Sequence, residues 1–144
     1  MQLLSTDGWQ DYELLDSGNG KRLERFGRYI ISKPDPQAIW LPKLNQFDWD
    51  KADATYLDKG WNNNQLPQKW PLTYRNVKFY AKLTPFKHTG VFPEQALNWT
   101  FIIDKIQKAS KQISVLNLFG YTGIASLVAA ANNAKVTHLD GSKP

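Results

Sequence analysis

Two glycines and a single aspartate near the C-terminal end of the sequence have residue types and a spacing suited to binding a nucleoside. Gly120 and Gly123 flank Tyr121 and Thr122, and a glycine lets the backbone approach a ligand closely where a Cβ would block it. Asp140 follows 20 residues after Gly120. The two oxygens of such a carboxylate can accept both hydroxyl hydrogens of a ribose. The pattern therefore predicts a site for a nucleoside-bearing cofactor.

The loop sequence restricts which cofactor of this kind it suits. Dinucleotide sites normally show G-x-G-x-x-G, and P-loops end in Gly-Lys-Ser/Thr; this loop reads Phe-Gly-Tyr-Thr-Gly and has neither pattern. S-adenosylmethionine carries a ribose but no phosphate, so it needs only the close approach and the carboxylate. Two alternatives stay open. One is a nicotinamide-dependent oxidoreductase, which the missing pattern disfavours, and the other is a purely structural turn, since any β-α-β connection carries turn glycines.

The residues around this loop predict a β-α-β unit. Residues 113–119 form an apolar, β-rich run of the kind that is buried on both faces of a sheet, residues 124–131 favour a helix, and residues 135–140 form a second strand. Such a unit opens a parallel α/β sheet. Parallel sheets bind ligands at the carboxyl ends of their strands, which is where the loop and Asp140 fall. We expect His138, inside the second strand, to be structural.

Two further elements are predicted directly upstream. The stretch 76–84 alternates, which predicts a half-buried strand with a basic outer face; Val77, Phe79, Ala81 and Leu83 share one side, while Lys78, Tyr80 and Lys82 share the other. A helix is predicted from Pro93 to Ser110, because apolar residues recur at helical spacing from Trp99 to Ile106.

The first part of the chain reads as short strands. Residues 12–15 and 21–26 are predicted to pair as a hairpin across residues 16–20, where Asn19-Gly20 supplies the positive φ that a tight turn needs. Further strands are expected at 28–32 and 38–41, followed by a long, partly ordered connection over 42–71. The chain is therefore predicted to divide into a β-rich domain over residues 1–84 and a second domain over residues 85–144.

Composition and charge narrow the class of protein. The sequence is 42% hydrophobic and 22% charged, which is typical of a folded globular chain. The formal net charge of +5 weakly favours a polyanionic partner such as nucleic acid. Since there is no cysteine, disulfides, cysteine-based zinc sites and a thiol nucleophile in this chain are excluded, and two histidines are too few for a histidine-rich metal site. Without a signal-peptide pattern or a long apolar stretch, we expect a cytoplasmic protein that uses neither a membrane nor a metal.

Three stretches of the sequence resemble a known family. Residues 82–99 (KLTPFKHTGVFPEQALNW) and 115–143 (VLNLFGYTGIASLVAAANNAKVTHLDGSK) resemble the class I S-adenosylmethionine-dependent methyltransferases of the bacterial 23S rRNA type. Residues 11–40 resemble the small β-rich domain that precedes the methyltransferase domain in one branch of that family. The resemblance implies an α/β fold (α+β overall), with a small N-terminal β-rich domain followed by the first β-α-β unit of a Rossmann-like methyltransferase domain. It also implies rRNA methylation with S-adenosylmethionine as cofactor.

The resemblance further implies which residues hold the cofactor. The first cofactor motif would be 115–123, and Asp140 would hold the ribose. The residues implied to line the site are Asn117, Phe119, Gly120, Tyr121, Thr122, Gly123, Asp140, Gly141, Ser142, Phe92, Glu94 and Gln95. Two positions depart from the general class I pattern, which has an acid where Asn117 stands and a glycine where Phe119 stands. Contact with the methionine amino group is therefore the least supported part of the site.

No catalytic residue can be named from this sequence. The family's Asp-Pro-Pro or Asn-Pro-Pro motif, which borders the methyl acceptor, is absent, and the sequence ends after the second predicted strand of the methyltransferase domain. We therefore expect a fragment of a longer enzyme, a chain that must pair with a partner or a second copy, or a non-catalytic RNA- or protein-binding module. The absence of cysteine favours a ring nitrogen as the methylated atom, because methylation at a cytosine carbon would need a thiol.

Basic and aromatic residues suggest contact with RNA. For each group, a purely structural role is the alternative to RNA binding. Four basic residues, Arg75, Lys78, Lys82 and Lys87, together with His88, could form a lip for RNA phosphates, or could be a solvated strand face. The tryptophans at 9, 40, 49, 61 and 70 could stack on bases, but we expect most of them to build the core of the β-rich domain.

Overall fold

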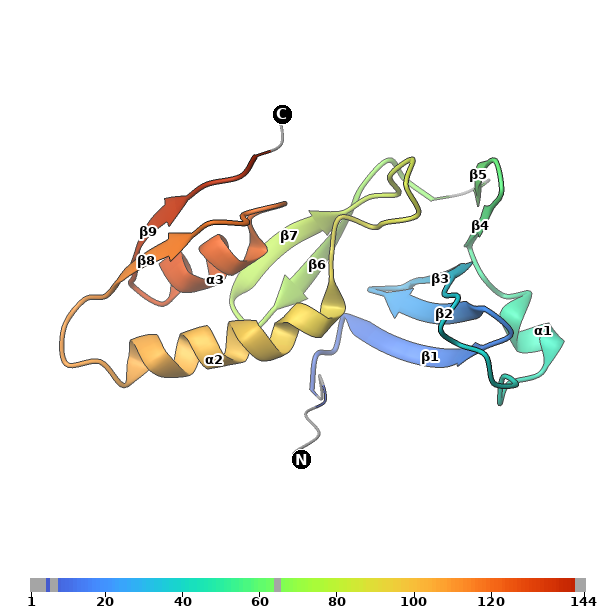
Figure 1. The fold of residues 1–144 in the computed structure, drawn as a ribbon, viewed down its shortest axis with the longest axis horizontal. Coiled ribbons are helices and arrows are strands. Elements are labelled where there is room, and N and C mark those ends of the chain that lie inside the picture. Colours follow the sequence, from blue (N-terminus) through green and yellow to red (C-terminus); the bar gives the residue numbers. More distant parts are fainter. Residues whose placement is uncertain (1–4, 6–7, 64–65, 142–144) are drawn as a thin grey trace. The chain divides into compact units, whose positions relative to one another are not determined.

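The structure is a computed structural model that describes residues 5, 8–63 and 66–141, and it divides into two compact units (Figure 1). The unit termed here the β unit consists of Trp9–Tyr74 and Tyr80–Val91, and the other, termed the α/β unit, consists of Met1–Gly8, Arg75–Phe79 and Phe92–Pro144. The chain passes between the units more than once, whereas the sequence suggests a single boundary after residue 84. The predicted division into domains over residues 1–84 and 85–144 is therefore kept as a prediction.

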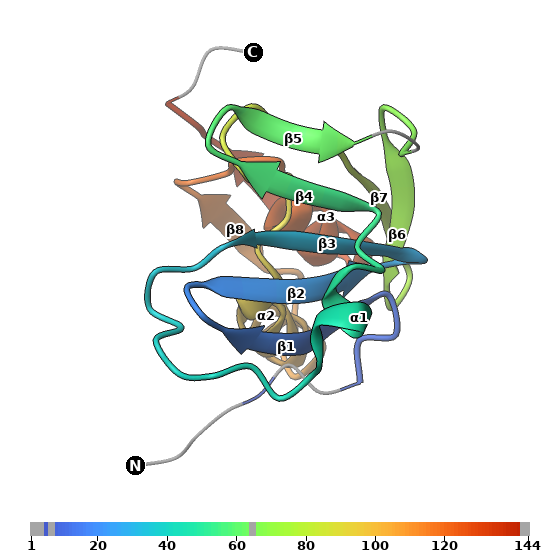
Figure 2. The same ribbon diagram turned by 90° about the vertical axis from the view of Figure 1, so that its right-hand side faces the viewer.

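A five-stranded sheet forms the β unit, with the strands in the order β1-β2-β3-β4-β5 (Figure 2). β1 (Tyr12–Gly18) and β2 (Lys21–Phe26) pair antiparallel, and β2 pairs antiparallel with β3 (Tyr29–Pro34). Asn19 (φ 49°) and Gly20 (φ 73°) form the turn between β1 and β2. The predicted hairpin is therefore confirmed, with a first strand that extends further than expected.

The predicted strand at 38–41 is wrong. This segment lies along the β1–β2 turn instead, where the carbonyls of Ala38 and Trp40 accept hydrogen bonds of 2.8 Å from the amides of Gly20 and Asn19. Prolines at 36 and 42 flank the segment, and a proline has no amide hydrogen for a strand ladder. The apolar side chains that suggested a strand point outward, with Ile39 86% and Leu41 80% exposed.

The predicted connection at 42–71 contains more regular structure than expected. It includes α1 (Gln46–Trp49), β4 (Ala54–Leu57), β5 (Gly60–Asn63) and the first residues of β6 (Trp70–Tyr74). β4 pairs parallel with β3 and antiparallel with β5. Short strands of this kind carry little periodicity of their own and are stabilised by pairing with a distant strand.

The core of the β unit is built from side chains of several strands and two tryptophans. Leu23, Phe26, Ile31, Trp70 and Leu72 are all at most 2% exposed. The indole nitrogen of Trp70 donates to the Phe26 carbonyl at 3.1 Å, and that of Trp9, which is 6% exposed, donates to the Thr73 carbonyl at 2.7 Å. The expectation that tryptophans build this core is thus confirmed for Trp9 and Trp70, but Trp40 is 54% exposed.

The predicted strand at 76–84 is confirmed in its alternation but is shorter. β7 (Val77–Ala81) pairs with β6 in a two-stranded sheet. Val77, Phe79 and Ala81 are buried, whereas Lys78 and Tyr80 are exposed. The strand ends at Ala81, and the next amide, that of Lys82, donates to the carbonyl of Thr89.

The α/β unit contains the predicted helix and the predicted β-α-β unit. A 3₁₀ turn, η1 (Pro93–Gln95), leads into α2 (Ala96–Gln107), which buries Trp99 and Ile103. β8 (Ser114–Asn117), α3 (Ile124–Ala131) and β9 (Lys135–His138) follow, and β8 pairs parallel with β9 from Ser114 opposite Lys135 to Asn117 opposite His138.

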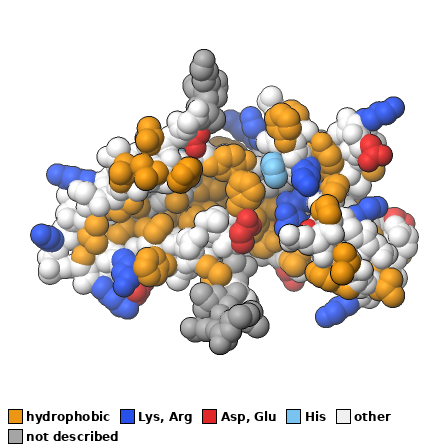
Figure 3. Space-filling view, viewed as in Figure 1, with side chains coloured by type: hydrophobic (Ala, Val, Ile, Leu, Met, Phe, Trp, Pro, Cys, Tyr) orange, Lys and Arg blue, Asp and Glu red, His pale blue; other side chains and the backbone are white. Residues whose placement is uncertain are grey.

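The prediction that residues 113–119 are buried on both sheet faces is wrong. Leu116 is 60%, Leu118 51% and Phe119 90% exposed. Within the described residues, β8 and β9 form a two-stranded sheet with α3 packed against it, so apolar side chains remain on the surface over these elements (Figure 3). No helix among the described residues is long and apolar enough to cross a membrane.

Candidate cofactor site

The loop after β8 forms a tight turn that leads directly into α3. The amide of Gly120 donates to the Leu139 carbonyl at 2.9 Å, and the amide of Gly123 donates back to the Gly120 carbonyl at 2.8 Å. Gly123 (φ 87°) is the N-cap residue of α3, a backbone conformation that favours glycine. Tyr121 also has a positive φ, of 48°. The turn therefore presents backbone groups at the carboxyl end of β8, as the sequence predicts.

Asp140 ties this turn to the end of β9. Its Oδ2 atom accepts a hydrogen bond of 2.6 Å from the amide of Tyr121, and the preceding residue, Leu139, donates its amide to the Asn117 carbonyl at 2.8 Å. The carboxylate thus lies beside the glycine turn at the ends of two parallel strands, where open α/β sheets bind ligands.

Gly120 is needed for a reason that the sequence does not reveal. A Cβ atom at this position would overlap the imidazole ring of His138, which fills the space that a side chain would take. The sequence predicts that a small residue here permits close approach by a ligand, whereas in the structure the side chain of His138 makes that approach. His138, expected to be only structural, therefore contacts the glycine turn directly.

A chain of hydrogen bonds holds this histidine. The side-chain amide of Asn117 donates to Ser126 Oγ at 2.9 Å, and Ser126 Oγ lies 2.9 Å from His138 Nδ1. Ser126 Oγ therefore joins the Asn117 amide to the His138 ring, and the direction of its bond with Nδ1 depends on the tautomer of the imidazole. Asn117 stands where the general class I pattern has an acid, and here it orients the ring below the turn.

A cavity of about 390 Å³ lies between η1, α2 and the glycine turn. This volume falls within the range of about 300–1,000 Å³ that is typical of small-molecule sites. The rings of Phe92 and Tyr121 meet here, with their centroids 5.1 Å apart, and partial burial raises the pKa of Tyr121 above its ordinary value. The residues that line the cavity are Phe92, Gln95, Trp99, Phe119, Gly120, Tyr121, Thr122, Ile124 and Ala125.

The structure brings about half of the predicted site residues to this cavity. Phe92, Gln95, Phe119, Gly120, Tyr121 and Thr122 line it, whereas Glu94, Asn117, Gly123, Asp140 and Gly141 do not. Glu94 and Gly141 are exposed, and Ser142 lies outside the described residues. All of these assignments to a cofactor stay predictions.

Five residues at or beside the site are not predicted from the sequence. Ile124 and Ala125 follow the turn directly, so their place at the start of α3 could have indicated them. Trp99 is one helical turn after Gln95 and shares its side of the helix. Ser126 and His138 could not be found in this way, because their role depends on the register between β8 and β9.

The four predicted RNA-binding residues fall in both units. Arg75, in the β6–β7 turn with φ 50°, and Lys78 on β7 are exposed and belong to the α/β unit. Lys82 and Lys87 belong to the β unit, where Lys82 is exposed and Lys87 is half-buried. Their common role in binding RNA stays a prediction. Among the described residues there is no group of histidine, aspartate and glutamate side chains that could hold a metal ion.

Comparison with known proteins points to methyltransferases. No family model matches the chain. A solved structure of the SAM-dependent methyltransferase from Agrobacterium tumefaciens superposes with a TM-score of 0.90 at 44% sequence identity, over 94% of this chain and 45% of that one. The present chain thus spans less than half the length of that protein.

Two more distant structures share the fold. One is a proposed SAM-dependent methyltransferase from Streptococcus mutans (TM-score 0.66, 17% identity), and the other is SMU.776, a proposed methyltransferase solved with S-adenosylhomocysteine (TM-score 0.65, 18% identity). Each match covers 92% of this chain and 39% of the other. The chain thus has a mixed α/β fold similar to that of a SAM-dependent methyltransferase.

Proposed function

We propose that this chain is the cofactor-binding part of an S-adenosylmethionine-dependent methyltransferase that methylates a base in 23S rRNA. In this proposal the β unit corresponds to the small N-terminal β-rich domain, and β8, α3 and β9 are the first β-α-β unit of a Rossmann-like methyltransferase domain. The observation that carries the proposal is the cavity beside the glycine turn at the end of β8. The 44% identity to the Agrobacterium methyltransferase supports it.

The residues around the cavity suit S-adenosylmethionine better than a dinucleotide. The lining is largely aromatic and apolar, with Phe92, Trp99 and Tyr121 available to contact an adenine ring or an aliphatic chain. Asp140 provides a carboxylate next to the turn for a ribose. No lysine or arginine is among the lining residues, as expected for a cofactor without phosphate groups.

When bound, S-adenosylmethionine supplies a methyl group on a positively charged sulfur. Transfer of that methyl group to a nitrogen of the base would leave S-adenosylhomocysteine, and the proton of that nitrogen would pass to solvent. Little acid–base chemistry is required, because most of the rate comes from holding the two reactants in line. The part of this chain is to hold the cofactor: the turn, held by Asp140 and His138, keeps its backbone fixed, and the aromatic side chains that line the cavity contact the cofactor.

The proposal also includes a partner, a cellular location and an oligomeric state. rRNA is the proposed partner, in agreement with the net charge of +5, and we place the protein in the cytoplasm, without a membrane or a metal. Pairing with a second copy of the chain is a further part of the proposal, which light scattering at several concentrations tests.

Calorimetry with S-adenosylhomocysteine tests the cofactor assignment. The chain should bind S-adenosylhomocysteine and not NADH, and Phe92→Ala should weaken binding about tenfold because it removes the ring that contacts Tyr121. Phe86→Ala is the matched control, since it truncates a phenylalanine that is 76% exposed and lies outside the cavity. Binding of NADH in place of S-adenosylhomocysteine would instead favour the oxidoreductase.

The second candidate function is a non-catalytic RNA- or protein-binding module with the same fold. The net charge of +5 favours binding of RNA in either case. Calorimetry with S-adenosylhomocysteine separates the two, because a module that only binds RNA or protein would not bind the cofactor product.

A further inference from the structure

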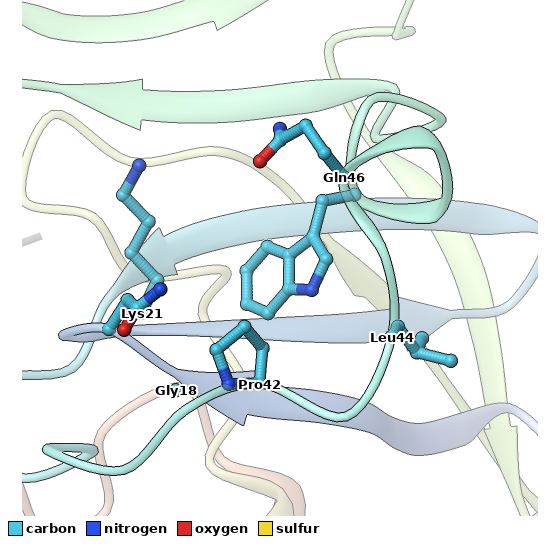
Figure 4. Close-up of a pocket in the computed structure, with 7 residues that line it drawn as sticks. Gly18, Lys21, Pro42, Leu44 and Gln46 are labelled. Carbon is cyan, nitrogen blue, oxygen red and sulfur yellow. The ribbon is translucent and has the colours of Figure 1, made fainter.

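The β unit contains a small pocket that is separate in its residues from the cofactor cavity. It has a volume of about 140 Å³ and lies between the β1–β2 turn and α1 (Figure 4). Gly18, Asn19, Lys21, Pro42, Leu44, Gln46 and Trp49 line it, and it is termed here the Trp49 pocket. Typical small-molecule sites have about 300–1,000 Å³, so this pocket suits a single ring system and not a whole cofactor.

A buried carboxylate fixes one wall of the Trp49 pocket. Asp16 is 7% exposed, and its oxygens accept hydrogen bonds from the amides of Ser17, Lys43 and Leu44 at 2.8–3.2 Å. The indole nitrogen of Trp49 donates to the same carboxylate at 3.1 Å. The ring is therefore held in one orientation before any ligand arrives.

The opposite wall is fixed by close backbone packing. A Cβ atom at Gly18 would overlap the backbone of Pro42, so the segment before α1 lies directly on the β1–β2 hairpin. Trp40 adds a second tie, because its indole nitrogen donates to the Ser17 carbonyl at 2.8 Å. A preorganised pocket of this kind loses little conformational freedom when it binds a ligand.

The polar groups at the pocket are suited to a nucleotide. Gln46 donates its side-chain Nε2 to Asp50 at 2.7 Å, which leaves its carbonyl oxygen to accept from the edge of a base. Lys21 is exposed, and within the described part of the chain it takes part in no ion pair. Its side chain extends at the side of the pocket opposite Leu44 (Figure 4).

Exposed aromatic and basic side chains continue from the pocket along the adjoining segment. Trp40 is 54% and Phe47 71% exposed, and Lys43 is exposed beside them. Three acidic groups lie nearby: Asp16 is buried in its hydrogen bonds, Asp48 pairs with Lys51 at 2.7 Å, and Asp50 is exposed and accepts a hydrogen bond from Gln46. Figure 3 shows hydrophobic side chains gathered over α1 and the segment before it, at the right of the view.

We propose that the Trp49 pocket binds one nucleotide of a single-stranded RNA. The base lies in the pocket against Trp49 and Pro42, Gln46 accepts a hydrogen bond from its edge, and Lys21 contacts a backbone phosphate. Aromatic platforms combined with a basic surface are the usual means of binding single strands. The inference rests on the RNA part of the proposed function and adds a contact surface that is independent of the cofactor cavity.

The test is the affinity of the chain for fluorescein-labelled single-stranded oligouridylate, measured by fluorescence anisotropy. Lys21→Gln and Gln46→Ala should each weaken binding about fivefold or more, as expected for loss of a phosphate contact or a base contact. Lys59→Gln is the matched control. It removes the same charge from an exposed position in the β4–β5 turn, at the other edge of the five-stranded sheet, and should change affinity less than about twofold.

Three outcomes would overturn the proposal. Equal losses of affinity for Lys21→Gln and Lys59→Gln would mean that RNA binding depends only on the net charge of the protein. Uridine monophosphate that binds as tightly as the oligonucleotide would make the pocket a free-nucleotide site. If neither the oligonucleotide nor uridine monophosphate bound, the pocket would have a different occupant, such as a side chain of a partner protein. Calorimetry of the unsubstituted chain with S-adenosylhomocysteine tests the proposed function separately, so the two can fail independently.

Discussion

At the scale of single residues, the turn after β8 depends on one contact between a glycine and a histidine. The ring of His138 occupies the place of a side chain at Gly120, and Ser126 and Asn117 hold that ring from the other side. His138 is thus a positioning residue, because it contacts the glycine turn without lining the cavity. The three polar side chains form one unit with the turn.

Gly120→Ala should therefore destabilise the chain by about 1–3 kcal/mol, as is usual when a methyl group is forced into filled space, and should weaken binding of S-adenosylhomocysteine. The double variant Gly120→Ala/His138→Ala should recover much of that stability, because the obstructing ring is gone. Urea unfolding of both variants measures the two effects. Gly141→Ala is the control, since a Cβ there meets nothing within 4 Å; a double variant no more stable than Gly120→Ala would contradict the steric explanation.

At the scale of elements, Asp16 joins β1 to α1 and the segment before it. Burial alone would raise the pKa of this carboxyl, but hydrogen bonds from the amides of Leu44, Lys43 and Ser17 and from the Trp49 indole outweigh it, so the pKa of Asp16 is lowered from 3.8. The unfolded chain then binds more protons than the folded chain around and below pH 4. The stabilisation is fully present above that pH and is lost as the pH falls through the folded-state pKa.

Asp16→Asn should accordingly reduce stability at neutral pH by about 1–3 kcal/mol, because several buried donors lose their acceptor. The variant should also lose less stability than the unsubstituted chain as the pH falls below about 4. Unfolding midpoints measured across this range provide the comparison. Asp58→Asn removes an exposed carboxylate from the β4–β5 turn and serves as the control; the same acid response in all three proteins would exclude a role for Asp16.

At the scale of the whole molecule, the net charge of +5 should make RNA binding depend on salt. The logarithm of the association constant should fall linearly with the logarithm of the salt concentration, because each phosphate contact releases a counterion. If Lys21 contacts a phosphate, Lys21→Gln should reduce this slope by about 1. Anisotropy titrations from about 50 to 200 mM salt measure the slope; an unchanged slope in Lys21→Gln would remove Lys21 from the phosphate contacts.

Elements whose pattern lies in neighbouring residues can be predicted from the amino-acid sequence. The periodicity of Trp99 to Ile106 and of Val77 to Ala81 predicted a helix and a strand that the structure contains, and the β-α-β unit was read from its apolar runs and glycines. These patterns depend on neighbours within a few positions along the chain, so a sequence displays them directly. The glycine turn and Asp140 could be singled out for the same reason.

Features that depend on contacts between distant residues are visible only in the folded structure. It paired β4 with β3, placed the 38–41 segment along a turn instead of in a sheet, put His138 against Gly120, and closed the Trp49 pocket with Asp16. Each of these contacts joins segments that are far apart in the sequence and depends on register and packing. No local pattern records such a contact, because its free energy arises only when both partners are already in place.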